Sequence, residues 1–218
     1  MSDLYPTTEA TALRRKPERG SHQRAVVNRI LDEGLVCHVG WVRAGRPVVI
    51  PTLYARVGET LFLHGSPASS TLRGVRGLEM CVTVTLVDGL VLARSAFNSS
   101  VNYRSVVVMG KASEVTDPEQ KRVALEALVE HSLPGRLAHL RPMTDKEARA
   151  TMVLRLPIEE ASAKVRTGPP DDDHADLDFP VWAGVLPLTT SYGPAQPDPL
   201  LTGTAEPPLH VTQYRRTP

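Results

Sequence analysis

The chain has 218 residues, of which 41% are hydrophobic and 22% are charged, a composition typical of a globular protein with one substantial core. Its 25 lysines and arginines nearly balance 24 aspartates and glutamates, so the net charge of +1 gives no general attraction to nucleic acid or to an anionic membrane. No apolar run reaches the roughly 18 residues of a membrane span, and the first 20 residues lack the apolar core of a signal peptide. We therefore expect a cytoplasmic protein.

Composition changes at two points along the chain and predicts three parts. Residues 1–20 are polar and aperiodic, which predicts a flexible N-terminal arm. Residues 21–190 carry the regular patterns and form the predicted domain. Residues 191–218 are rich in proline and predict a tail that wraps around the domain or extends from it.

The domain opens with one helix and three strands. Ser21 is the expected N-cap of an amphipathic helix, and Gly34 stands where a left-handed C-terminal residue is common. Residues 35–65 contain three β-branched runs joined by short turns, which predict a three-stranded meander. Pro51 falls inside the second run and cannot donate a ladder hydrogen bond, so that strand must lie at an edge, be bulged, or be interrupted where a ligand approaches.

Later segments continue the strand-rich pattern. The clearest helix follows Asp117, which can cap it, and Pro118, which suits the first helical position. The other predicted elements are a short helix within 66–77, strands at 79–89, 90–97, 103–116, 151–158 and 181–188, and a short helix at 144–150. Because the early connections are too short for parallel crossovers, we predict a mainly β, α+β fold: a small antiparallel barrel, closed or nearly closed, with peripheral helices.

Few residues suggest metal or nucleophile chemistry. Cys37 and Cys81 lie in apolar runs and are expected to be core residues rather than a disulfide or zinc pair. The acidic run 171–178 is typical of a solvated loop, so no metal site is predicted. The chain shows no Ser/His/Asp set, paired-acid motif or glycine-rich dinucleotide fingerprint at useful spacing, and we assign no catalytic residue.

Four stretches occur in an order that indicates a family. They are VIPTLY at 49–54, LFLHGSPASSTLRGV at 61–75, LVLARSAFNSSVNYRSVVVMGKA at 90–112 and ASAKVRTGPP at 161–170. Together they resemble the FMN-binding split β-barrel family related to pyridoxamine 5′-phosphate oxidase. The resemblance implies a six-stranded split barrel, bound FMN, and a homodimer that holds FMN at the subunit interface. The sequence alone does not identify the small-molecule substrate.

The resemblance also implies which residues contact FMN. The flavin ring would lie along the second strand and the phosphate near the helix after the third, where hydroxyls and helix N–H groups favour an anion, although such hydroxyls often only cap the helix. Relatives frequently carry Arg or Lys at positions 70–71, so Arg94 or Arg104 would have to supply the cation, although either could instead be a solvent-facing strand residue. The predicted contacts are Val49, Ile50, Pro51, Thr52, Leu53, Tyr54, His64, Gly65, Ser66, Ser69, Ser70, Thr71, Arg94, Asn102, Tyr103, Arg104 and Ser105.

The function implied by the resemblance is that of an FMN-dependent oxidoreductase, in which the flavin carries the electrons. Two alternatives stay open: a non-catalytic module that binds flavin or haem, and a deazaflavin-dependent reductase. Pyridoxamine 5′-phosphate oxidase activity itself is not expected, because the proline-rich C-terminal segment shows no Trp…Arg-x-x-x-Arg arrangement of the kind that family places around its substrate.

Overall fold

The computed structural model describes residues 2–202 and 206–216, with the side chains of Ser70, Thr71 and Arg73 outside the described part. Contacts divide the chain into two compact units. Unit 1 comprises Met1–Gly34, Val82–Met109 and Glu159–Thr190, and unit 2 comprises Leu35–Cys81, Gly110–Ile158 and Ser191–Pro218. The division by sequence into an arm, a domain and a tail stays a prediction.

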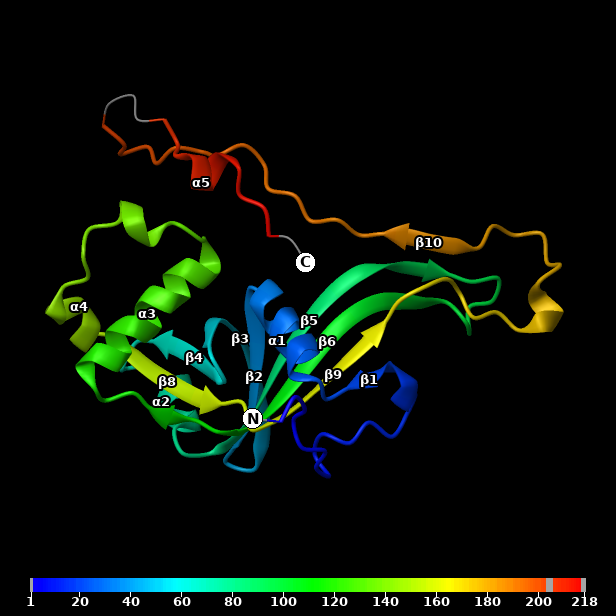
Figure 1. Ribbon diagram of the computed structural model, residues 1–218, viewed down its shortest axis with the longest axis horizontal. Helices are drawn as coiled ribbons and strands as arrows, with labels where there is room; N and C mark the ends of the chain where they lie inside the picture. The colour runs from blue at the N-terminus through cyan, green and yellow to red at the C-terminus, as the bar shows by residue number, and fades with distance from the viewer. Residues whose placement is uncertain (1, 203–205, 217–218) are drawn as a thin grey trace. The chain divides into compact units, whose positions relative to one another are not determined.

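Unit 1 is an antiparallel sheet with one helix. Its long strands β5 and β6 run side by side (Figure 1), and β9 pairs with β6 in register Tyr103↔Arg166. The sheet order is β1-β9-β6-β5, and β10 pairs with the last four residues of β5, from Gly89 to Leu92. The elements are β1 (Gly20–Ser21), α1 (Arg24–Glu33), β5 (Glu79–Leu92), β6 (Ser100–Lys111), β9 (Glu160–Arg166), β10 (Gly184–Pro187) and the short 3-10 helices η1 (Pro17–Arg19) and η3 (His174–Asp176).

The N-terminal segment packs into unit 1, which differs from the predicted flexible arm. Tyr5 is only 2% exposed, its hydroxyl donates to Asn28 at 3.1 Å, and Arg24 lies over its ring. The Thr8 hydroxyl donates to Glu160 of β9 at 2.8 Å. The prediction of a flexible arm rested on the polar composition of the segment and did not take Tyr5 into account. Burial of this aromatic side chain is favourable enough to order the segment.

Unit 2 holds the predicted meander and most of the helices. β2, β3 and β4 follow one another as antiparallel neighbours, so the three-stranded prediction is confirmed, and Ala44 and Gly45 form the first turn with positive φ angles of 49° and 75°. The sheet order is β2-β3-β4-β8-β7. The elements are β2 (Val36–Arg43), β3 (Arg46–Val57), β4 (Thr60–Gly65), α2 (Ser70–Val75), β7 (Ser113–Glu114), α3 (Pro118–Ser132), η2 (Leu137–His139), α4 (Asp145–Arg149), β8 (Met152–Pro157) and α5 (Leu209–Thr212).

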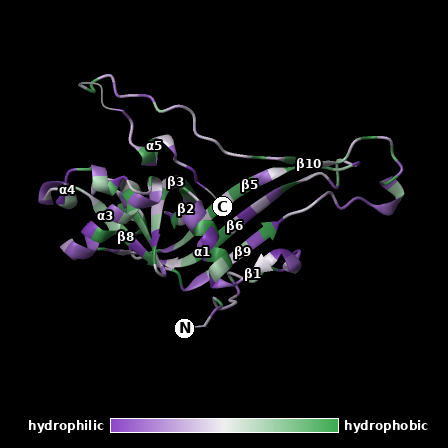
Figure 2. Cartoon of the chain, turned by 45° about the horizontal axis from the view of Figure 1, so that its top comes forward, coloured by the Kyte–Doolittle hydropathy of each residue, from purple (hydrophilic) through white to green (hydrophobic). Residues whose placement is uncertain are grey.

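Helix α3 covers one face of the unit 2 sheet (Figure 1), and hydrophobic residues are interspersed with hydrophilic ones along it (Figure 2). Its buried Ala124, Leu125 and Leu128 pack against Ala55 of β3 and Val153 of β8. This packing holds α3 beside the end of β4, which matters for the site described below.

The start of α3 follows the sequence prediction. The Asp117 carboxylate accepts the Gln120 N–H at 2.8 Å, and Pro118 takes the first helical position. We expect Asp117→Ala to lower the free energy of unfolding by about 1 kcal/mol, because one helix N–H loses its partner. Asp117→Asn is the matched control and should retain most of the stability. A denaturant titration in which Asn costs as much as Ala would show that the negative charge, not the capping hydrogen bond, is what stabilises the helix.

Three details of the prediction are wrong. Gly34 ends α1 with φ −65°, an extended rather than left-handed conformation. Residues 79–97 do not form two strands, because β5 continues through Asp88 and Gly89 to Leu92. A Cβ at Gly89 would lie 2.8 Å from the Leu186 carbonyl oxygen, so glycine there serves the close approach of β10 rather than a turn.

The predicted fold class is confirmed: a mainly antiparallel β structure with peripheral helices. The described residues form ten strands rather than six, and neither unit's sheet closes on itself, so the expected near-closure is wrong. Among the described residues, no helix is both long and apolar enough to cross a membrane.

Candidate functional site

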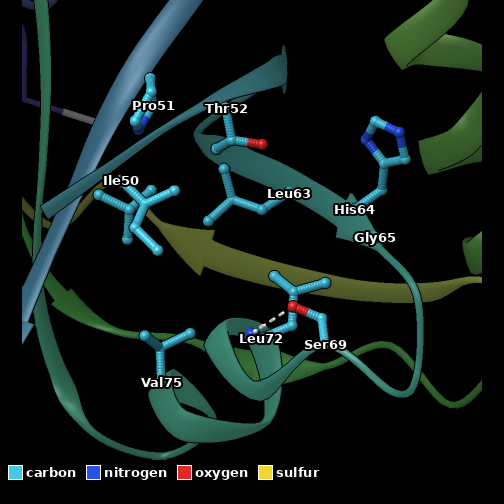
Figure 3. A pocket seen from close by; sticks show the side chains of 10 residues that line it. Ile50, Pro51, Thr52, Leu63, His64, Gly65, Ser69, Leu72 and Val75 are labelled. Carbon is cyan, nitrogen blue, oxygen red and sulfur yellow. Dashed lines mark hydrogen bonds between the residues drawn. The ribbon is translucent and has the colours of Figure 1, made fainter. Parts of the chain in front are cut away.

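A small pocket lies beside the part of β3 that pairs with only one other strand. β4 pairs with β3 only from Tyr54 to Val57, so the β3 backbone at 50–52 has β2 on one side and no described strand on the other. Pro51 therefore sits where no ladder donor is needed, as its place in the sequence predicted. We call the pocket beside it the β3 pocket; its volume is about 140 Å³, and it is lined by Val39, Ile50, Pro51, Thr52, Leu63, His64, Gly65, Ser69, Leu72 and Val75 (Figure 3).

The turn after β4 brings hydroxyls to one end of the β3 pocket. Ser69 caps α2 by accepting the Leu72 N–H at 3.4 Å, and Ser66 accepts the Ala68 N–H at 3.1 Å. Each serine uses its oxygen as an acceptor, which leaves its O–H proton able to donate to an anion. Gly65 permits the turn, because a Cβ there would lie 2.7 Å from Leu72 Cδ1.

His64 ends β4 and lines two pockets. Its ring points away from Ser69 and Leu72 (Figure 3), and Nδ1 is buried without a hydrogen-bond partner among the described residues. Burial lowers the pKa of His64 from its ordinary value of 6.5, so the imidazole is neutral at pH 7. A neutral, unsatisfied imidazole is a ready ligand for a metal or a donor to a bound molecule.

The second pocket, which we call the α3 pocket, lies between His64 and the segment from α3 to α4. It has a volume of about 650 Å³, within the range of sites that hold organic cofactors. Its rim carries Arg141 and Glu147, which form an ion pair. The lining residues are His64, Leu125, Glu126, Val129, Leu137, Leu140, Arg141, Pro142, Met143, Glu147 and Thr151.

Comparison with known proteins decides the family. The family model of pyridoxamine 5′-phosphate oxidase matches residues 23–165. The chain belongs to this pyridoxamine 5′-phosphate oxidase-like family. A search of curated proteins finds no match.

Two solved structures of this family are similar over nearly the whole chain. The flavocytochrome Anf3 from Azotobacter vinelandii is 39% identical, with a TM-score of 0.90 over 95% of this chain and 97% of that one. The FAD and haem binding protein from Mycobacterium smegmatis is also 39% identical, with a TM-score of 0.86 over 89% of this chain and 96% of that one. The split-barrel fold of the family is thereby established for this chain, and its homologues bind flavin.

The resemblance to the pyridoxamine 5′-phosphate oxidase family predicted seventeen residues in contact with FMN, and the structure brings only some of them together. Val49 and Leu53 do not line the β3 pocket and are exposed, Val49 to 65% and Leu53 to 39%. Tyr54 is buried and its ring packs against that of His131 at 4.9 Å between centroids. The members that line the β3 pocket are Ile50, Pro51, Thr52, His64, Gly65 and Ser69.

The predicted contacts from the later strands belong to unit 1. Arg104 binds both Glu33 and Asp88, and Arg94 pairs with Asp172 at 2.9 Å, so both guanidinium charges are matched by carboxylates. Asn102 is buried and accepts from Arg166. The Ser105 hydroxyl donates to the Lys164 carbonyl, and Tyr103 pairs with Arg166 in the β6–β9 ladder. These five residues and the side chains of Ser70 and Thr71, which lie outside the described part, remain predicted contacts.

Sequence reasoning missed the α3 pocket. Its residues come from β4, α3 and the loop before α4, and no motif joins them. The only local signal was a surplus of apolar residues in the connection 137–143, which a solvent-exposed loop would not need. The pocket exists because α3 packs across β3 and β8, a tertiary arrangement without a sequence signature.

Proposed function

We propose that this protein binds a flavin and a haem and passes electrons between a small-molecule substrate and these two groups. The observation that carries the proposal is a pair of adjoining pockets in unit 2, both lined by His64, whose Nδ1 has no partner among the described residues. The printed names of the two relatives at 39% identity, a flavocytochrome and an FAD and haem binding protein, support the same pair of cofactors.

The residues of the β3 pocket fit a flavin ring laid along the strand. The free backbone edge at 50–52 offers hydrogen-bonding groups, and Ile50, Leu63 and Leu72 offer apolar contact. The pocket alone is too small to enclose a drug-sized ligand, so the ring would lie partly outside it and need a further cover. The side chains position the ring and exclude water from one of its faces.

The residues of the α3 pocket fit a haem. Most lining side chains are apolar, which keeps water from an iron centre, and His64 supplies the nitrogen that iron prefers. A bound flavin would exchange one or two electrons and a bound haem one at a time, so single electrons could pass between them. No side chain of either pocket needs to act as an acid or base for this electron transfer.

FAD is the expected flavin, because the Mycobacterium smegmatis relative is named for it, and FMN is the alternative that the sequence resemblance implies. Purified protein should show flavin and haem absorption bands after incubation with both groups. Mass spectrometry of the released flavin distinguishes FAD from FMN. Protein that quenches the fluorescence of neither flavin would overturn the proposal.

The phosphate end of the flavin is expected at Ser66 and Ser69. Each hydrogen bond to a charged phosphate contributes roughly 1.5–3 kcal/mol, so the double variant Ser66→Ala/Ser69→Ala should weaken FAD and FMN by far more than riboflavin. Riboflavin, which has the ring but no phosphate, is the matched ligand. Fluorescence titrations that show equal losses for all three ligands would place the phosphate elsewhere.

A homodimer provides the missing cover. Large apolar side chains are exposed on β2 and β3, with Val42 and Val49 more than 60% exposed, and along the segment 177–188, where Trp182 is 69% exposed. Val106 and Val108 of β6 are buried inside the chain and are not available for such a contact. Light scattering of the protein with flavin bound should report twice the chain mass of 23.8 kDa. A monomer with full flavin affinity would contradict the shared site.

A further inference from the structure

We infer that His64 is the axial ligand of the haem iron in the α3 pocket. This inference rests on the proposed binding of haem and goes beyond it, because the comparisons assign no iron ligand to any residue of this chain.

Position is the first argument. His64 is the only histidine that lines the α3 pocket among the described residues, and its neighbours there include Leu125 and Val129 of α3 and Leu140 of the following loop. Those apolar side chains could not bind iron. The remaining heteroatoms of the pocket belong to Arg141 and Glu147, which pair with each other, and to Glu126, Met143 and Thr151. Met143 is the one other lining residue type that commonly binds haem iron.

The state of the imidazole is the second argument. A buried polar atom usually has a hydrogen-bond partner, and one without a partner calls for an explanation. Nδ1 of His64 is such an atom among the described residues.

Three other histidines of unit 2 make ring contacts away from the α3 pocket, although Nε2 of His210 is, like Nδ1 of His64, buried without a partner among the described residues. His131 packs against Tyr54 and receives the Arg216 guanidinium on its carbonyl oxygen. His139 and His210 stack on each other at 4.4 Å between ring centroids. None of these three lines the α3 pocket.

The position of His64 has a consequence for electron transfer. The same side chain lines the β3 pocket, where the flavin is proposed, and the α3 pocket. An axial ligand at this point would place the iron and the flavin on two sides of one residue. Electrons would then have a path of a single side chain between the two groups.

The test compares three proteins titrated with haemin, the ferric chloride salt of the haem: the unaltered chain, His64→Ala and His174→Ala. His174 is the matched control because it is exposed and lies in η3 of unit 1. The readouts are the Soret band, the electron paramagnetic resonance signal of the ferric iron, and the rate of haemin transfer to apomyoglobin. Circular dichroism confirms that each variant is folded.

We expect His64→Ala to shift the Soret band and to transfer haemin to apomyoglobin faster than the unaltered chain does. The increase in rate should exceed the roughly 10–100-fold loss of affinity that removal of an outer-shell partner of a metal ligand causes. Added imidazole should fill the space left by the side chain and restore the spectrum. His174→Ala should behave as the unaltered chain does.

Two other outcomes separate this inference from the proposed function. If the unaltered chain binds haemin and His64→Ala keeps its spectrum and transfer rate, the ligand assignment is wrong while haem binding stands; Met143→Leu then tests the other candidate. If the unaltered chain binds no haemin, the proposed haem function fails and the assignment falls with it.

Discussion

Replacement of Arg104 by methionine is expected to lower the free energy of unfolding by about 2 kcal/mol, between the values for exposed and for buried ion pairs, because the cluster is partly buried. The Arg104 guanidinium donates to Asp88 at 2.7 and 2.9 Å and to both oxygens of Glu33, one of them at 2.7 Å. Its side chain is 15% exposed. The hydrogen bonds that Arg104 donates to Asp88 and then to Glu33 raise its pKa above the ordinary value, so it stays charged at any pH at which the protein is folded.

The loss comes from the two carboxylates that remain. Methionine fills similar space but removes the guanidinium that binds both Glu33 and Asp88, so two partly buried like charges stay close together without it. Arg104→Lys should also destabilise, because an ammonium cannot form two bidentate pairs. The triple variant Arg104→Met/Glu33→Gln/Asp88→Asn should recover part of the loss by removing the charges.

Lys111→Met is the matched control for this prediction. Lys111 pairs with Glu79, and both side chains are largely exposed, so its replacement should change the stability by no more than about 0.5 kcal/mol. Urea titrations of the variants give the comparison. An Arg104→Met variant as stable as Lys111→Met would show that the cluster does not stabilise unit 1.

Replacement of Val129 by tryptophan is expected to abolish most haem binding while flavin binding persists. Val129 lines the α3 pocket but not the β3 pocket. A larger side chain there occupies space that the haem needs, and overfilling a packed site costs typically about 1–3 kcal/mol, or about a 5- to 150-fold loss of affinity.

The same helix offers the control. Val123 is 46% exposed on α3, so Val123→Trp introduces the same side chain outside the pocket. Haemin and flavin titrations of both variants measure the difference. If Val129→Trp and Val123→Trp bind haemin equally well, the haem does not occupy the α3 pocket. If Val129→Trp loses flavin as well, the two cofactor sites are not separate.

The sequence by itself predicted those structures that depend on residues close together along the chain. Asp117 and Pro118 mark the start of α3 because a cap and a proline at the first position act within one turn. The β-branched runs of 35–65 predicted the meander because side-chain alternation and short turns leave few other arrangements. Pro51 pointed to an edge, a bulge or an interruption, because a missing N–H is a property of that residue alone, and the structure shows a local edge in an unbroken strand.

Only the tertiary structure decided what depends on distant residues. Asp88 and Gly89 suggested a turn, yet β5 continues there because β6 and β10 pair along both its edges. Arg104 looked suited to bind a phosphate until the fold placed Glu33, 71 residues away, and Asp88 beside it. The α3 pocket is lined by His64 together with residues between 125 and 151, and no sequence pattern predicts that these residues lie close together. Burial and charge pairing depend on neighbours in space rather than on neighbours in sequence.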